Sequence, residues 1–95
     1  MAKLPKNAVF VYYYSENTGN APYLGGTRVI VCKTFEKAYT EMEKDVNAFI
    51  ERYDAEVLSQ WVNNQSLQHA TSSCVALQMP DGHILDLHIA PAIPF

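Results

Sequence analysis

One helix constrains the fold of this chain more than any other feature. Between Phe35 and Tyr53, apolar residues recur at steps of three and four, the spacing that places side chains on one face of an α-helix. Thr34 precedes the pattern, and its hydroxyl is suited to accept a hydrogen bond from the first turn of that helix. The apolar stripe consists of Phe35, Ala38, Tyr39, Met42, Val46, Phe49, Ile50 and Tyr53. A stripe of this kind is typical of a helix that packs on the core of a larger domain.

Two strands are expected before this helix. The segments Ala8 to Tyr14 and Thr27 to Lys33 are rich in β-branched and aromatic residues, which favour strands. Residues 15–26 between them contain several Asn, Gly and Pro residues, which favour turns. The simplest arrangement is an antiparallel hairpin with a long loop, and loops of this length are often functional.

A second hairpin is expected near the end of the chain, around Pro80, Asp81 and Gly82. A two-residue loop would turn Leu77 and Leu85 to opposite faces of the sheet. A three-residue loop pairs them, with Pro80 at the first corner and Gly82 in the left-handed position. This second register also pairs Val75 with Leu87 and Met79 with His83.

The segment 54–65 is ambiguous. Its apolar residues keep a helical period and Asp54 is suited to begin a second helix, so helix is favoured over the alternative of a short strand. The order β-β-α-(α)-β-β then predicts an α+β fold, with a four-stranded, mainly antiparallel sheet and one helix layer packed on one face. Residues 1–95 are expected to form a single domain, with 1–7 as an N-terminal arm and 91–95 as an extended C-terminal tail.

The charge balance limits the partners that this chain is suited to bind. The net charge is −3 and the seven Lys and Arg residues form no run, so nucleic acid is not expected as a partner. Acidic residues concentrate between Glu36 and Glu56, where Glu41 and Asp45 are candidates for an acidic surface. No apolar region typical of a signal peptide or a membrane span is found, so we expect a cytoplasmic protein with reduced cysteines and no membrane contact.

A catalytic or metal site is a weak alternative. The predicted hairpin register places Cys74 opposite His88, with Asp86 two residues away on the same face. These are the parts of a thiol nucleophile with its base, or of three metal ligands. However, the sequence has no nucleophile elbow, no phosphate-binding loop and no Cys-x-x-Cys pair. We therefore expect no enzymatic activity, no cofactor and no metal.

The first strand suggests a binding surface. Successive side chains of a strand point to opposite faces, and here both faces are apolar. If the helix covers Val9, Val11 and Tyr13, the other three aromatic residues face outward as an unusually apolar patch. The residues expected to contact a partner or ligand are Phe10, Tyr12, Tyr14, Asn17, Asn20, Tyr23 and Arg28. The alternative is that Trp61 and residues 54–70 fold over this patch.

These observations predict a non-enzymatic module that binds a partner protein. Its short, acidic and signal-free character is that of small inhibitors and adaptors, including accessory proteins carried by phages. The sequence leaves open a homo-oligomer that binds or sequesters a small ligand such as a nucleotide. A homodimer is expected in either case.

Overall fold

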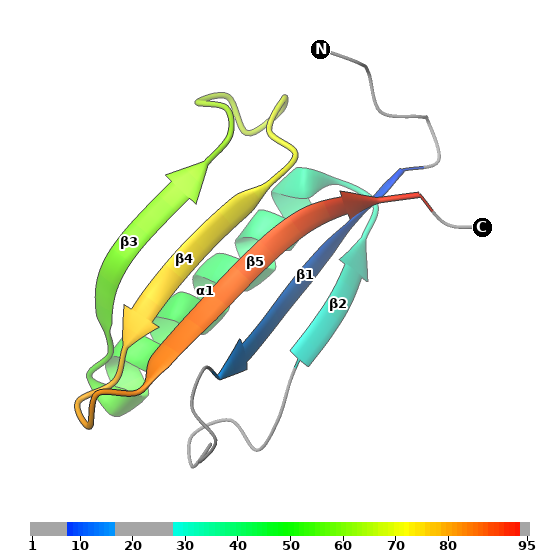
Figure 1. Cartoon of the computed structure of the whole chain (residues 1–95). Helices are drawn as coiled ribbons and strands as arrows, with labels where there is room; N and C mark the ends of the chain where they lie inside the picture. The colour runs from blue at the N-terminus through cyan, green and yellow to red at the C-terminus, as the bar shows by residue number, and fades with distance from the viewer. Residues whose placement is uncertain (1–7, 17–27, 94–95) are drawn as a thin grey trace.

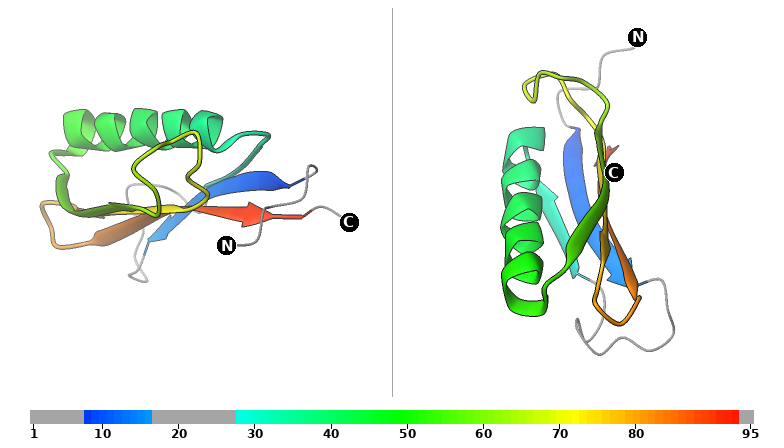
Figure 2. Two further views of the ribbon diagram at one scale, coloured as in Figure 1. Left: turned by 90° about the horizontal axis from the view of Figure 1, so that it is seen from above. Right: turned by 90° about the vertical axis from the view of Figure 1, so that its left-hand side faces the viewer.

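A computed structural model describes residues 8–16 and 28–93 of the chain. It has two layers, a five-stranded antiparallel sheet and one helix packed on one side of it (Figure 1). Seen from above, the helix covers one face of the sheet and leaves the other face without a helix (Figure 2). The elements are β1 (Val9–Glu16), β2 (Arg28–Cys32), α1 (Phe35–Tyr53), β3 (Glu56–Val62), β4 (Ser73–Gln78) and β5 (Ile84–Ala92). The α+β fold is therefore as predicted, with one strand more than expected.

The strand order in the sheet is β2-β1-β5-β4-β3. Each of the two hairpins forms as predicted, and β1 then pairs with β5, which joins the two hairpins into a single sheet. β5 extends to Ala92, so the predicted tail of residues 91–95 begins inside a strand. The predicted loop 15–26 begins too early, because β1 continues through residues 15 and 16. The predicted arm 1–7 and residues 17–27 lie outside the described residues.

The helix begins and ends where the local signals place it. The hydroxyl of Thr34 accepts from the backbone N–H of Lys37 at 3.2 Å. At the other end Asp54 adopts a left-handed conformation, with φ 56°, and its backbone N–H donates to the carbonyl of Ile50 at 3.1 Å. Asp54 is thus the C-cap of α1 rather than the start of a second helix, and the left-handed residue turns the chain away from the helix axis.

The prediction of a helix over residues 54–65 is wrong, because Glu56–Val62 forms the edge strand β3 against β4. The register shifts between Val57 and Ser59, which leaves Leu58 as the extra residue of a β-bulge. Val57 lies opposite the buried Leu77, and the bulge breaks the alternation of faces that follows. A bulged strand therefore imitates the helical spacing of its apolar residues, which explains the error.

The second hairpin has the three-residue loop that its sequence predicts. The backbone N–H of Met79 donates to the carbonyl of His83 at 2.8 Å, and Gly82 has φ +94°. Leu77 pairs with Leu85 in this register, and both side chains are buried beneath α1. The other buried apolar residues of this hairpin are Val75, Met79, Leu87 and Ile89, and from α1 the core receives Phe35, Ala38, Met42 and Phe49.

The orientation of β1 is the reverse of the one expected. Phe10, Tyr12 and Tyr14 face α1, and Tyr12 is completely buried. The ring of Phe10 meets Phe35 edge to face at 6.0 Å, and the ring of Tyr14 meets Phe49 in the same way at 5.8 Å. The pairing with β5 decides this, because Tyr12 lies opposite the buried Ile89 and neighbours across a sheet share a face.

The described residues contain no helix that is long and apolar enough to cross a membrane.

Candidate binding face of the sheet

The face of the sheet that is turned away from α1, called the open face below, carries one continuous row of side chains. Five residues lie opposite one another in adjacent strands and cross the whole sheet, and they come from β3, β4, β5, β1 and β2 in that order. They are Trp61, Cys74, His88, Tyr13 and Val29. Because all five strands contribute to it, this row exists only in the folded protein.

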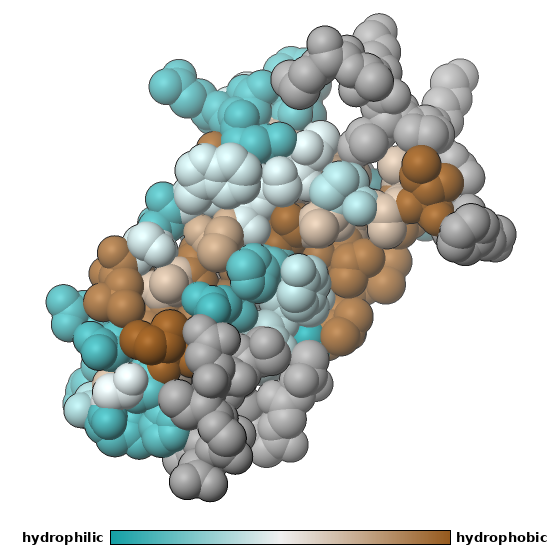
Figure 3. Space-filling model, viewed as in Figure 1, coloured by the Kyte–Doolittle hydropathy of each residue, from teal (hydrophilic) through white to brown (hydrophobic). Residues whose placement is uncertain are grey.

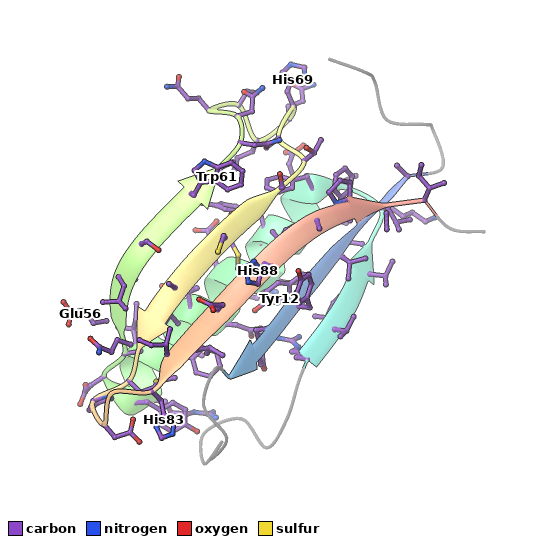
Figure 4. The ribbon with its side chains drawn as sticks, in the orientation of Figure 1. Tyr12, Glu56, Trp61, His69, His83 and His88 are labelled. Carbon is purple, nitrogen blue, oxygen red and sulfur yellow. The ribbon has the colours of Figure 1, made fainter. Side chains whose placement is uncertain are left out.

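Aromatic side chains dominate the row. The rings of Tyr13 and His88 are stacked, with centroids 5.2 Å apart and planes inclined by 23°. Trp61, on the edge strand β3, is 55% exposed, which is high for the largest apolar side chain in the protein. Figure 4 labels Trp61 and His88 on the side of the sheet that is turned to the viewer. The row therefore has a packed aromatic pair in its interior and an exposed indole at one end.

Two exposed valines extend the open face on the opposite edge. Val29 and Val31 of β2 are 61% and 62% exposed, and they lie opposite Tyr13 and Val11 of β1. Figure 3, in the same view, shows hydrophobic side chains toward both edges of this face and hydrophilic ones between them. Asp86, which lies opposite Ala76, is one of the polar residues in the middle of the face.

The predicted Cys, His and Asp residues do share one face of the sheet, with Asp86 two residues from His88 along β5. Cys74 does lie opposite His88, as the hairpin register predicts. The pKa of the Cys74 thiol is raised above its usual value because burial disfavours the thiolate, and the Asp86 carboxylate adds to this. A raised pKa is the opposite of what a thiol nucleophile needs near neutral pH. Among residues 8–16 and 28–93, no group of three His, Cys, Asp or Glu side chains is placed to hold a metal ion.

Of the predicted contact residues, the three aromatic side chains of β1 do not belong to the open face. Phe10, Tyr12 and Tyr14 lie between the sheet and α1, so their expected exposure is wrong. The hydroxyl of Tyr12 donates to the Oδ2 atom of Asp45 at 2.7 Å. Its pKa is raised above its usual value because of burial first and the nearby Asp45 second. This tyrosine therefore ties the sheet to the helix.

The predicted acidic surface is partly neutralised within the protein. Arg28 forms an ion pair with Asp45, and its second guanidinium nitrogen lies 3.6 Å from Glu41. Lys44 approaches Glu41 at 3.8 Å on the same side of α1. Arg28, Glu41 and Asp45 thus form a cluster between β2 and α1, on the helix side of the sheet. The predicted contact residues Asn17, Asn20 and Tyr23 lie outside the described residues.

Sequence reasoning missed Trp61, Tyr13, Val29 and Val31 as members of one surface. The pairing of β1 with β5 could have revealed this surface, because its register places Tyr13 opposite His88 and therefore on the open face. This pairing connects residues that are far apart in the sequence, and no local pattern indicates it.

Two grooves flank α1 on the helix side. One, of about 220 Å³, lies between α1 and β3 and includes Val46, Ile50 and Val57. The other, of about 350 Å³, lies between α1 and β2, and its wall includes Ile30, Cys32 and Thr40. Both are partly open to solvent, so neither encloses a small molecule in the way that typical ligand pockets do.

Comparison with models of protein families, with curated proteins and with solved structures found no match to this chain.

Proposed function

We propose that this protein is a non-enzymatic binding module whose open face occupies the surface of a partner protein, as an inhibitor or an adaptor does. The observation that carries the proposal is the row across the sheet, in which an exposed indole at Trp61 and the stacked pair of Tyr13 and His88 lie on one face, with Cys74 between them. Trp and Tyr are the side chains most enriched among the residues that contribute most to protein–protein affinity.

The composition of the open face supports a protein partner. Hydrophobic side chains lie toward the edges of this face and polar ones such as His88 and Asp86 lie between them (Figure 3). Interfaces between proteins that also exist apart have a similarly mixed composition, although their apolar residues usually gather at the centre. A sheet also presents its side chains on a rigid backbone, so little conformational entropy is lost when a partner binds.

The same face is poorly suited to nucleic acid. Aromatic residues on a sheet can stack on bases, but such sites are accompanied by Lys and Arg that contact phosphates. Within the five described strands, the one Lys or Arg is Arg28, and it lies on the helix side in its ion pair with Asp45. The open face instead carries the carboxylate of Asp86.

The test is affinity capture with the wild-type chain and with Trp61→Ala, followed by binding measurements on the purified partner. We expect the partner to bind Trp61→Ala at least about tenfold more weakly, the effect of a residue central to an interface. The melting temperature should not change, because Trp61 is largely exposed.

The matched control is Ile50→Ala. Ile50 is 39% exposed, but it lies on α1, on the other side of the molecule from the open face. It should leave the affinity unchanged. Equal binding of the partner by the wild type and Trp61→Ala, or a loss with Ile50→Ala alone, would contradict the proposal.

A further inference from the structure

We infer that the outer edge of β2 pairs with the β2 strand of a second copy of this chain, in antiparallel register around Ile30. In this arrangement two five-stranded sheets join into one. The inference does not depend on the proposed function, because it concerns the backbone edge of β2. Val29 and Val31, whose side chains stand beside that edge, also belong to the open face.

The two edges of the sheet differ in how they are protected. Edge strands expose unpaired N–H and C=O groups, and proteins usually guard them with bulges, prolines or charges. β3 has the bulge at Leu58. β2 contains neither a bulge nor a proline, and its one charged side chain, Arg28, turns inward to Asp45. Within residues 8–16 and 28–93, no strand pairs with the outer side of β2.

The faces of β2 restrict the register of such a pair. Residues opposite one another in a sheet share a face. Across a two-fold axis, Val29 and Val31 of one copy can therefore lie opposite each other's counterparts, or each opposite the same valine of the second copy. Pairing around Ile30 is the register that uses all five residues of the strand. It places Val29 of one copy opposite Val31 of the other, twice. These two valines are more than half exposed in the single chain, and the pairing brings apolar side chains together.

Charges on α1 are arranged to fit the same two-fold axis. Arg28, at the start of β2, meets Asp45 in the third turn of α1, whereas Cys32, at its end, lines the groove with Glu36. The helix therefore runs antiparallel to β2, and Ile30 lies level with Thr40. Glu36 and Lys44 stand one turn to either side of Thr40 on an exposed side of α1. An axis at Ile30 brings Lys44 of one copy to the level of Glu36 of the other along the strand direction, so the charges at equal level are opposite in sign.

Light scattering on a size-exclusion column, over a concentration series, measures the mass. We expect the wild type to approach twice its chain mass of 10.7 kDa. The double variant Val29→Lys, Val31→Lys should have the mass of a single chain, because two lysines then face each other at two places. Its circular dichroism should be unchanged, because both positions are exposed.

The double variant Val29→Lys, Val31→Glu tests the register. It should recover the dimer mass, because pairing around Ile30 sets each lysine opposite a glutamate of the other copy. Registers centred on position 29 or on position 31 would instead set two lysines or two glutamates opposite each other. Leu58→Lys, at the other edge strand, should leave the dimer intact, and so should Trp61→Ala, which separates this inference from the proposed function.

Several results would overturn the inference. They are a wild-type monomer at every concentration, a persistent dimer in the double-lysine variant, failure of the Lys and Glu variant to recover the dimer, or loss of the dimer in Leu58→Lys or Trp61→Ala.

Discussion

Replacing Tyr12 with Phe removes one hydroxyl group from the interior and leaves the ring in place. The ring is fully buried and meets Tyr14 edge to face at 6.0 Å. The lost hydrogen bond joins the hydroxyl to Asp45 at 2.7 Å, and bonds to charged groups typically contribute about 1.5–3 kcal/mol. Arg28 keeps Asp45 paired in the variant, so we expect the low end of this range.

We therefore expect Tyr12→Phe to lower the free energy of unfolding by about 1.5–2 kcal/mol. In a domain of this size, that loss lowers the melting temperature by about 10 °C. Tyr12→Ala also removes the ring, and the cost of truncating a buried aromatic side chain is about 3–5 kcal/mol.

The pH dependence of stability gives an independent check. The pKa of Tyr12 is raised in the folded protein because burial disfavours the phenolate and Asp45 accepts the hydrogen bond of the hydroxyl. The unfolded chain thus releases this proton at a lower pH than the folded protein does. The resulting stability is fully present below the usual tyrosine pKa of about 10 and is lost as the pH rises above it. The loss is at most about 1.4 kcal/mol per pH unit, and Tyr12→Phe lacks it, so the two proteins should converge in stability at high pH.

The assay is urea denaturation followed by circular dichroism, at neutral pH and above the usual tyrosine pKa. The matched control is Tyr13→Phe, because Tyr13 is the next residue along β1 and lies on the open face against His88. It should change the stability by no more than about 0.5 kcal/mol. Equal stability of Tyr12→Phe and the wild type, or native-like stability of Tyr12→Ala, would refute the assignment of Tyr12 to the core.

Two further predictions concern the second hairpin. Gly82→Ala should lower the free energy of unfolding by about 1–2 kcal/mol, because Gly82 has φ +94° and a side chain makes such a left-handed backbone unfavourable. A Cβ there would meet no atom within 4 Å, so no steric clash adds to this cost. Urea denaturation measures this, and an unchanged midpoint would show that the loop has another conformation. Cys74 should react with iodoacetamide at neutral pH more slowly than a model thiol, because its pKa is raised by burial and by Asp86. Asp86→Asn should speed this reaction and leave that of Cys32 unchanged, whereas a wild-type rate above that of the model thiol would support a nucleophilic role.

The sequence by itself determined the elements whose signals are local. The helix from Phe35 to Tyr53, its cap at Thr34 and the three-residue loop at Pro80 all depend on residues within one turn of each other. The register of that loop also placed Cys74 opposite His88, because a hairpin extends its register along both strands. These features could be predicted because the interactions that form them are close in the chain.

Only the tertiary structure decided which face of each strand is buried. Both faces of β1 are apolar, so its orientation depends on the distant strand β5, which pairs Tyr12 with the buried Ile89 and turns Tyr13 to the open face. The assignment of β3 depends in the same way on β4, because its bulge at Leu58 imitates a helical period. The candidate binding face consists of side chains from all five strands, so it follows from those long-range pairings, which leave no local pattern in the sequence.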